Sequence, residues 1–191
     1  MRVIGGKFRG RKLASPEDAR IRPTSDRARE ALFNILAHAD LTTDGTSPLG
    51  GAVVLDACCG TGAMGIEALS RGAARAAFLD NDPAALDLVR ASLKALDVTA
   101  QILRVDVRHP GRATEAASLV FLDPPYGEGI AAPALTALAE HGWIVPAALV
   151  VVETGPRDDF APPAGFTALD ERKYGKARFA LLRYAGQEPP A

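Results

Sequence analysis

The sequence predicts an α/β protein built on one doubly wound, mostly parallel sheet. From residue 52 onward, short apolar runs alternate with stretches whose apolar residues recur at helical spacing, which is typical of a parallel sheet with crossover helices. A glycine-rich turn directly follows the first apolar run, as in many sheets of this kind. The chain has 191 residues and is 48% hydrophobic, which is enough for one substantial core.

The first fifty residues are expected to form an extension to this sheet. Residues 2–13 predict two short strands around glycines, a small hairpin rich in Lys and Arg. Further along, Thr24 or Ser25 can cap a helix whose apolar positions follow helical spacing. A polar, glycine-rich linker at 42–51 then leads into the main domain. We therefore separate an extension, residues 1–50, from the sheet that follows it.

The main domain is expected to span residues 51–185. Its first five strands are predicted at Val53–Ala57, Ala76–Leu79, Gln101–Val105, Leu119–Leu122 and Ala148–Val152. Helices are predicted at about Ala63–Arg71, Pro83–Leu96 and Ala131–His141. Two last strands, Phe166–Lys173 and Arg178–Tyr184, are predicted to pair as a terminal hairpin, and residues 186–191 are expected to be a disordered tail.

Composition excludes several classes of protein. No run of about eighteen apolar residues is present, and the basic start lacks the apolar segment of a signal peptide, so we expect a cytoplasmic protein without a membrane partner. The only two cysteines, Cys58 and Cys59, are adjacent, which is poor geometry for a disulfide and too few ligands for zinc. We expect no metal site. No heptad pattern demands a partner, so a monomer is expected.

The charges are segregated along the chain. Residues 1–36 hold nine Lys and Arg against four acids, and residues 37–170 hold eight against seventeen. Residues 171–184 again carry five basic residues and one acid. If the fold brings both basic ends to one side, they form a positive face suited to a phosphate backbone. A solvated charged surface explains the same pattern equally well.

The glycine-rich turn follows a buried strand and opens a helix. Gly60, Gly62 and Gly65 fit the pattern G-x-G-x-x-G, which lets a backbone approach a nucleotide-like ligand at the carboxyl edge of the sheet. Dinucleotide enzymes share this pattern. However, Asp56 lies just before the glycines, where its charge would repel a pyrophosphate but could hold a cationic amino-acid group. A nicotinamide cofactor is therefore disfavoured.

Acidic residues also follow the next two strands. Asp80 ends the second strand, where a carboxylate can accept hydrogen bonds from both hydroxyls of a ribose. Asp82 could compete for this role, but it lies where a helix cap is needed before Pro83. Asp106 follows the third strand and could accept from an adenine amino group or cap its loop.

The most specific signal is the sequence Asp-Pro-Pro-Tyr at 123–126, directly after an apolar strand. Prolines donate no hydrogen bond, so the Asp123 carboxylate and the Pro124 carbonyl form an edge of acceptors only. Such an edge can bind both hydrogens of an exocyclic base amine and localise its lone pair on nitrogen. Tyr126 can stack on the base. The corner therefore predicts transfer of a group to a base amine.

Together, the glycine turn and this corner resemble the amine-directed class I methyltransferases that use S-adenosylmethionine. Four further segments are similar to the RsmD family of 16S ribosomal RNA guanine-N2 methyltransferases, so that the resemblance covers nearly the whole chain. These segments are residues 2–13, 22–34, 67–73 and 171–175. The sequence departs from the family at Cys58-Cys59, where an aromatic and a small residue are more common, and at Asp80, where Glu is more common.

The resemblance implies a Rossmann-like fold with a seven-stranded sheet and a reversed edge strand. It also implies an enzyme that transfers a methyl group from S-adenosylmethionine to a guanine in small-subunit ribosomal RNA, within an assembly intermediate or a subunit. Cofactor contacts are expected at Asp56, Gly60, Thr61, Gly62, Asp80, Asn81 and Asp106, and from a helix that starts at Thr24. Target contacts are expected at Asp123, Pro124 and Tyr126. RNA contacts are expected at Lys7, Arg9, Arg11, Lys12, Arg22 and Arg27.

Other functions remain open at this stage. The Asp-Pro-Pro-Tyr corner recognises an amine and not a particular base, so an adenine or cytosine in DNA or another RNA is an alternative target. A binding module without catalysis is a third reading. Glu153 ends a strand on the ligand side, where it could line the site or cap the strand. The three histidines lie at helix ends or in loops, and Trp143 is expected in the core.

Overall fold

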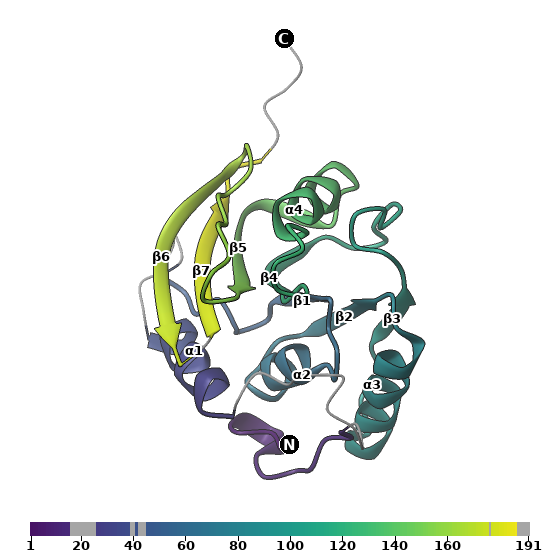
Figure 1. Ribbon diagram of the computed structural model, residues 1–191. Helices are drawn as coiled ribbons and strands as arrows, with labels where there is room; N and C mark the ends of the chain where they lie inside the picture. The colour runs from purple at the N-terminus through teal and green to yellow at the C-terminus, as the bar shows by residue number, and fades with distance from the viewer. Residues whose placement is uncertain (16–25, 39–40, 42–44, 176, 187–191) are drawn as a thin grey trace.

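The computed structural model describes residues 1–15, 26–38, 41, 45–175 and 177–186. Seven strands form one sheet in the order β3-β2-β1-β4-β5-β7-β6 (Figure 1). The strands are β1 (Val53–Ala57), β2 (Arg75–Asp80), β3 (Gln101–Arg104), β4 (Ala117–Leu122), β5 (Ile144–Thr154), β6 (Phe166–Tyr174) and β7 (Ala177–Tyr184). The predicted α/β, Rossmann-like fold is confirmed. The reversed strand is β7, which lies between β5 and the edge strand β6 and is antiparallel to both.

Helices cover both faces of the sheet (Figure 1). One face carries α1 (Asp26–His38), α2 (Ala63–Ser70) and α3 (Pro83–Leu96), which form one apolar core with the inward residues of the sheet. The opposite face carries α4 (Ala131–Glu140), whose core includes the buried Trp143. The first turn of α3 follows the expected chemistry, because the Asp82 carboxylate accepts from the N–H of Ala84, 2.9 Å away.

The central strands bring the ends of three connections to one edge. In β1, residues 54–57 are buried, as expected for a strand covered on both faces. Ala57 pairs with Leu79 of β2 on one side and with Leu122 of β4 on the other. The residues that follow these three, Cys58, Asp80 and Asp123, therefore lie at the same carboxyl edge.

The amino-terminal segment differs from the two predicted strands. Only one isolated bridge, Arg2 to Lys12, and a 3₁₀ helix, η1 (Gly6–Phe8), are present. The reason is that side chains of α2 take the backbone donors: Glu67 accepts from the N–H of Ile4 and Gly5, each at 2.8 Å. The two ends of the segment still pair, because the N–H of Val3 donates to the Arg11 carbonyl at 3.0 Å and the N–H of Leu13 donates to the Met1 carbonyl at 3.2 Å. The predicted hairpin is therefore present in a reduced form, and its middle packs on α2 in place of two regular strands.

A buried ionic cluster holds this segment in place. Arg29 of α1 and Glu67 of α2 are both at most 1% exposed, and the nearest atoms of their charged groups are 3.9 Å apart. The Arg29 guanidinium also donates to the Arg2 carbonyl at 2.5 Å. Glu67 is further bound by Arg71, whose Nε donates at 2.8 Å. Because buried charges need partners, the cluster ties the segment to α1 and α2.

The carboxyl-terminal half of the sheet confirms one sequence prediction and changes the start of one strand. The terminal hairpin is confirmed as β6 and β7. β5 begins at Ile144, earlier than the predicted Ala148, and its pairing with β4 shifts register near Ala147, which has a φ of 65°. No helix in the described part of the chain is long and apolar enough to span a membrane.

We expect Glu67→Ala to lower the free energy of unfolding by about 3 kcal/mol, because it removes the buried acceptor of the N–H groups of Ile4 and Gly5 and leaves Arg29 with Asp26 as its only carboxylate partner among the described residues. Urea unfolding followed by circular dichroism measures this. Glu115→Ala is the control, since Glu115 forms an exposed ion pair with Arg75 and its loss should change stability little. Equal losses in the two variants would contradict the role given to the cluster.

Candidate active site

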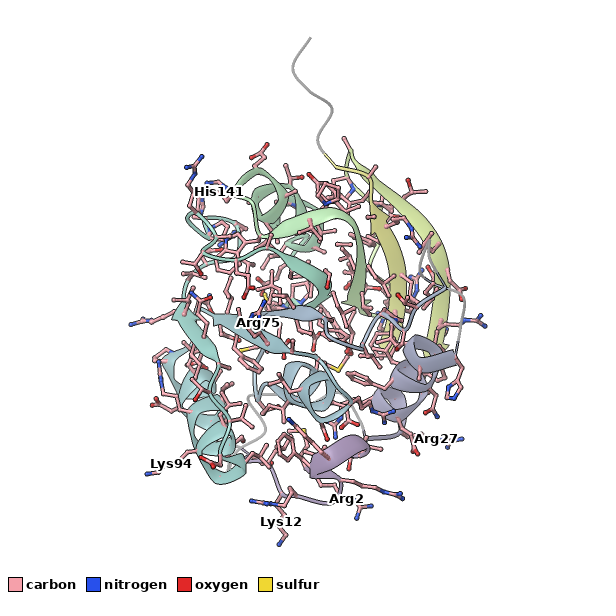
Figure 2. All side chains as sticks on the ribbon, turned by 180° about the vertical axis from the view of Figure 1, so that it is seen from behind. Arg2, Lys12, Arg27, Arg75, Lys94 and His141 are labelled. Carbon is pink, nitrogen blue, oxygen red and sulfur yellow. The ribbon has the colours of Figure 1, made fainter. Side chains whose placement is uncertain are left out.

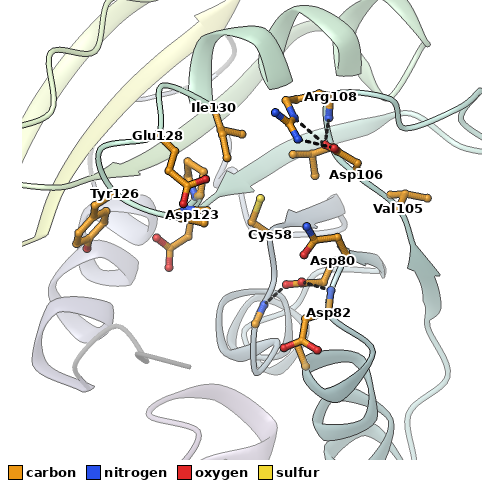
Figure 3. A pocket seen from close by; sticks show the side chains of 16 residues that line it. Cys58, Asp80, Asp82, Val105, Asp106, Arg108, Asp123, Tyr126, Glu128 and Ile130 are labelled. Atoms are coloured by element: carbon orange, nitrogen blue, oxygen red, sulfur yellow. Dashed lines mark hydrogen bonds and ion pairs between the residues drawn. The ribbon is translucent and has the colours of Figure 1, made fainter. Parts of the chain in front are cut away.

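A cavity of about 460 Å³ opens at the carboxyl edge of the sheet, between the loops that follow β1, β2, β3 and β4 (Figure 3). Its volume lies within the usual range for small-molecule sites. In this view Cys58 lies between Asp80 on one side and Asp123 on the other. The predicted residues Gly60, Asp80, Asn81, Asp106, Asp123, Pro124 and Tyr126 all line this cavity.

The glycines of the turn have two roles: one lines the cavity, and two allow close packing of the helix that follows. Gly60 lines the cavity with a φ of 52°, a conformation that favours glycine. A Cβ on Gly62 would lie 2.9 Å from Val89 Cγ2, and one on Gly65 would lie 2.5 Å from Phe78 Cε1. Gly62 and Gly65 therefore let α2 pack against β2 and α3. Thr61 is buried and does not line the cavity.

Asp56 lies beneath this turn. Its carboxylate is 2% exposed and accepts from the N–H of Gly65 at 2.8 Å, so it orders the start of α2 and is not part of the cavity wall. Burial raises the pKa of Asp56 to about 8, despite the hydrogen bond from Gly65, which acts in the opposite direction. A direct cofactor contact at Asp56 stays a prediction.

Asp80 organises the opposite wall. One carboxylate oxygen accepts from the N–H of Gly60 and the other from the N–H of Asp82, at 2.8 and 2.9 Å. These bonds fix the carboxylate next to the glycine turn, and Asp80 lines the cavity. Asp82 caps α3, as predicted from the sequence, and a ribose contact at Asp80 stays a prediction.

Asp106 is paired with Arg108 in the loop after β3. The side-chain and backbone donors of Arg108 lower the pKa of Asp106 to about 2. The carboxylate thus closes its own loop, as one of the two sequence interpretations expected, and it also lines the cavity. A contact to a ligand amine is compatible with this placement because each oxygen has more than one lone pair.

The Asp-Pro-Pro-Tyr corner forms the remaining wall. The Asp123 N–H donates to the Ala57 carbonyl at 3.2 Å, which holds the corner against β1. Burial, and then the nearby carboxylate of Glu153, raise the pKa of Asp123 well above its ordinary value. Tyr126 is 37% exposed, and its hydroxyl donates to Oε1 of Glu153 at 2.7 Å. The side chain is thus partly exposed, and its hydroxyl is held by Glu153.

The cavity wall is strongly acidic. Five carboxylates line it against one cationic side chain, Arg108, which is already paired with Asp106. The carboxylates belong to Asp80, Asp82, Asp106, Asp123 and Glu128. Such a wall repels a pyrophosphate and attracts a cation. Within the described residues, no three His, Cys, Asp or Glu side chains are grouped so that they could hold a metal ion.

The predicted RNA-binding residues that the structure describes, Lys7, Arg9, Arg11, Lys12 and Arg27, do not line this cavity. Figure 2 shows Arg2, Lys12 and Arg27 at one end of the molecule and His141 at the other. Arg11 donates to the Ala95 carbonyl of α3, and the Lys7 ammonium lies 4.8 Å from the Phe8 ring centre. The predicted contacts at Arg22 and Thr24 lie outside the described residues.

Sequence reasoning missed several residues of the wall. Val105, Val107, Glu128 and Ile130 line the cavity, although no motif marked them. Their common signal is position, because each lies in the loop that follows β3 or β4 at the carboxyl edge of the sheet. Cys58 also lines the cavity, whereas Cys59 is buried.

Comparison with known proteins gives the family. The family described as Conserved hypothetical protein 95 matches residues 1–183. The chain belongs to this family. A relative from Escherichia coli (strain K12), Ribosomal RNA small subunit methyltransferase D, is 32% identical over 190 residues, covering 98% of this chain and 91% of that protein. A protein of the same name from Haemophilus influenzae is 32% identical and covers 96% and 93%. The predicted family resemblance is thus confirmed.

Solved structures of similar proteins have the same fold as this chain. The structure of yhhF from Escherichia coli matches with a TM-score of 0.80 and 32% identity, covering 98% of this chain and 99% of that one. The rRNA methyltransferase aviRa from Streptomyces viridochromogenes matches with a TM-score of 0.65 and 23% identity over 88% of each chain, which shows the shared fold. The chain is a homologue of ribosomal RNA small-subunit methyltransferases.

We expect the free energy of unfolding to fall less steeply with rising pH in Asp56→Asn than in the wild-type protein. The Asp56 carboxyl has an ordinary pKa of 3.8 in the unfolded chain and a pKa of about 8 in the folded protein. Between these values the folded state binds more protons, so its stability falls as pH rises. Urea unfolding at intervals from pH 4 to 8 measures this.

The control for that series is Asp106→Asn. Because the folded pKa of Asp106 is about 2, this side chain contributes stability that is lost only as pH falls below about 4. The control should therefore leave the slope from pH 5 to 8 as in the wild type. An unchanged slope in Asp56→Asn would refute the raised pKa.

Proposed function

We propose that this protein transfers a methyl group from S-adenosylmethionine to the exocyclic N2 amine of a guanine in 16S ribosomal RNA. The observation that carries the proposal is the acceptor edge of Asp123 and Pro124, which faces the same cavity as Asp80 and Gly60. The relatives' names, which specify the small ribosomal subunit, support the choice of RNA. Residues 51–185 would form the catalytic domain and residues 1–50 an RNA-binding extension.

The charge and the volume of the cavity support S-adenosylmethionine as the cofactor. Its acidic wall suits a ligand that carries a sulfonium and an ammonium group. Asp80 is placed for the ribose hydroxyls, and the apolar side chains of Val105, Val107 and Ile130 for the adenine. When bound, this cofactor supplies an electrophilic methyl group. Asp56 would act through the turn that it orders, with or without a bridging water.

The corner would then orient the target. Asp123 and the Pro124 carbonyl would accept the two amine hydrogens and so localise the lone pair on the nitrogen. Tyr126 would stack on the face of the base. In a direct displacement the amine would take the methyl group that the cofactor supplies, S-adenosylhomocysteine would leave, and Asp123 would be placed to accept the released proton. Positioning supplies most of the acceleration, because the leaving group is a good one.

The raised pKa of Asp123 suits this last role. A carboxylate whose pKa is raised by burial holds a proton better than an exposed one. The target guanine must be unpaired or flipped out of a helix, because a paired guanine has its amine engaged. An RNA that is still being assembled, or the surface of a subunit, can present such a base.

The test is to incubate the protein with radiolabelled S-adenosylmethionine and ribosomal particles from cells that lack the activity. We expect N2-methylguanosine in the small-subunit RNA after nuclease digestion. N6-methyladenine or a methylated cytosine would retain the chemistry of the corner but overturn the choice of base. Binding of RNA and cofactor without any transfer would favour a binding module.

We expect Asp123→Ala to reduce turnover to background while the dissociation constant for S-adenosylmethionine changes by less than about threefold. Asp80→Ala is the matched variant, because it should weaken cofactor binding at least about tenfold through loss of charge-assisted hydrogen bonds. Calorimetric titration and the labelling assay measure the two effects. Near-normal turnover in Asp123→Ala would rule out the role given to this carboxylate.

Charge reversal of Lys7, Arg9 and Lys12 is expected to weaken RNA binding and to lower the slope of log K against log salt by about 2, since each phosphate contact contributes about 0.7–0.9. Arg11 is left unchanged because it donates to Ala95. Arg112→Glu is the control: its neighbour Ala113 donates to the carbonyl of His141, at the opposite end of the molecule. An unchanged slope in the triple variant would remove the segment from the interface.

A further inference from the structure

A carboxylate behind the Asp-Pro-Pro-Tyr corner is unexplained by the proposed chemistry. Glu153 is 5% exposed and lies at the end of β5. Because Leu122 of β4 pairs with Val152 of β5, Glu153 and Asp123 occupy equivalent places on adjacent parallel strands. Glu153 does not line the large cavity. It lines a second cavity of about 300 Å³ on the other side of the corner, together with Pro124 and Pro125.

Glu153 is instead bound to the ring that the proposed function uses as a stacking surface. The Tyr126 hydroxyl donates to Oε1 of Glu153 at 2.7 Å. A hydrogen bond to a carboxylate at this distance is short and strongly directional. It fixes the outer end of a side chain whose ring is otherwise 37% exposed.

The inner end of the same ring is fixed by the loop after β5. A Cβ on Gly155 would lie 3.0 Å from Tyr126 Cγ, so this backbone touches the root of the ring and leaves no space for a side chain. The Asp158 carboxylate accepts from the N–H of Gly127 at 3.0 Å and from the N–H of Gly155 at 2.8 Å. One carboxylate therefore ties together the loops on both sides of Tyr126.

We infer that Glu153 is a positioning residue: with the loop that Asp158 holds, it sets the orientation of the Tyr126 ring against which the target base stacks. The inference rests on the proposed function for the identity of the base. The ring is held at its hydroxyl and at its root before any base arrives, so little rotational freedom is lost when the base stacks.

A different role for Glu153 makes different predictions. The Glu153 carboxylate also lies near Asp123 and could act through its charge alone. Glu153→Gln keeps an oxygen that can accept from the Tyr126 hydroxyl but removes the charge, whereas Glu153→Leu removes both. Tyr126→Phe removes the hydroxyl and keeps the ring.

The test is a double-mutant cycle on kcat and KM for the RNA and for S-adenosylmethionine. We expect Glu153→Leu and Tyr126→Phe each to lower kcat about ten- to a hundredfold, with the KM for the cofactor unchanged. The double variant should be no worse than the more impaired single variant, and Glu153→Gln should retain most of the turnover. Equal losses in Glu153→Gln and Glu153→Leu, or multiplying losses in the double variant, would overturn the inference.

A second measurement is independent of activity. With 3-fluorotyrosine incorporated, the chain gives three fluorine NMR signals, one for each of its three tyrosines, and Tyr126→Phe assigns the one at the corner. We expect that signal to broaden or shift in Glu153→Leu but not in Glu153→Gln, while the signals of Tyr174 and Tyr184 serve as internal controls. An unchanged Tyr126 signal in Glu153→Leu would refute the positioning role.

The two measurements also separate this inference from the proposed function. If the wild-type protein methylates a base other than guanine, the proposed function fails, and the same cycle run on that base still decides the role of Glu153. If it methylates no RNA, the fluorine signal alone decides. Circular dichroism melting of each variant excludes misfolding as the cause of a lost activity.

Discussion

The in-register pairing of β2, β1 and β4 is the constraint on which the rest of the site depends. Because Ala57 pairs with Leu79 and with Leu122, the chain leaves the sheet at one edge three times. Asp80, the glycine turn and Asp123 then meet around one cavity although they are far apart in the sequence. A shift of one residue in either pairing would turn these side chains to the other face of the sheet.

Acidic side chains are concentrated at this edge of the sheet. Asp56, Asp80, Asp123 and Glu153 all follow or end central strands, and burial raises the pKa of Asp56 and of Asp123. The carboxylates differ in how they are satisfied: Asp56 and Asp80 accept backbone N–H groups, and Glu153 accepts a hydroxyl. Asp123 has no hydrogen bond to its carboxylate from the described residues, which leaves it free to accept from a ligand.

The amino-terminal segment shows how tertiary contacts override local pattern. Residues 2–13 predict two strands around glycines, but only the ends of the segment pair, because Glu67 of α2 accepts from the N–H groups of Ile4 and Gly5 in its middle. Ser70 accepts from Phe8 in the same way. By contrast, α3 has the predicted bounds because its start is local: Asp82 caps it and Pro83 begins it. A helix cap can be predicted from neighbouring residues, whereas contacts between residues more than sixty positions apart in the sequence cannot.

The sequence by itself determined the fold class, the order of the strands along the chain and the residues at their carboxyl ends, because periodicity and turn chemistry are local properties. It also determined the acceptor edge of Asp123 and Pro124, since proline has no N–H in any fold. Only the tertiary structure decided that Asp56 lies beneath the turn and that Glu153 binds Tyr126. Those facts depend on which strands are neighbours and on the direction in which each side chain points, and neither is encoded by spacing along the chain.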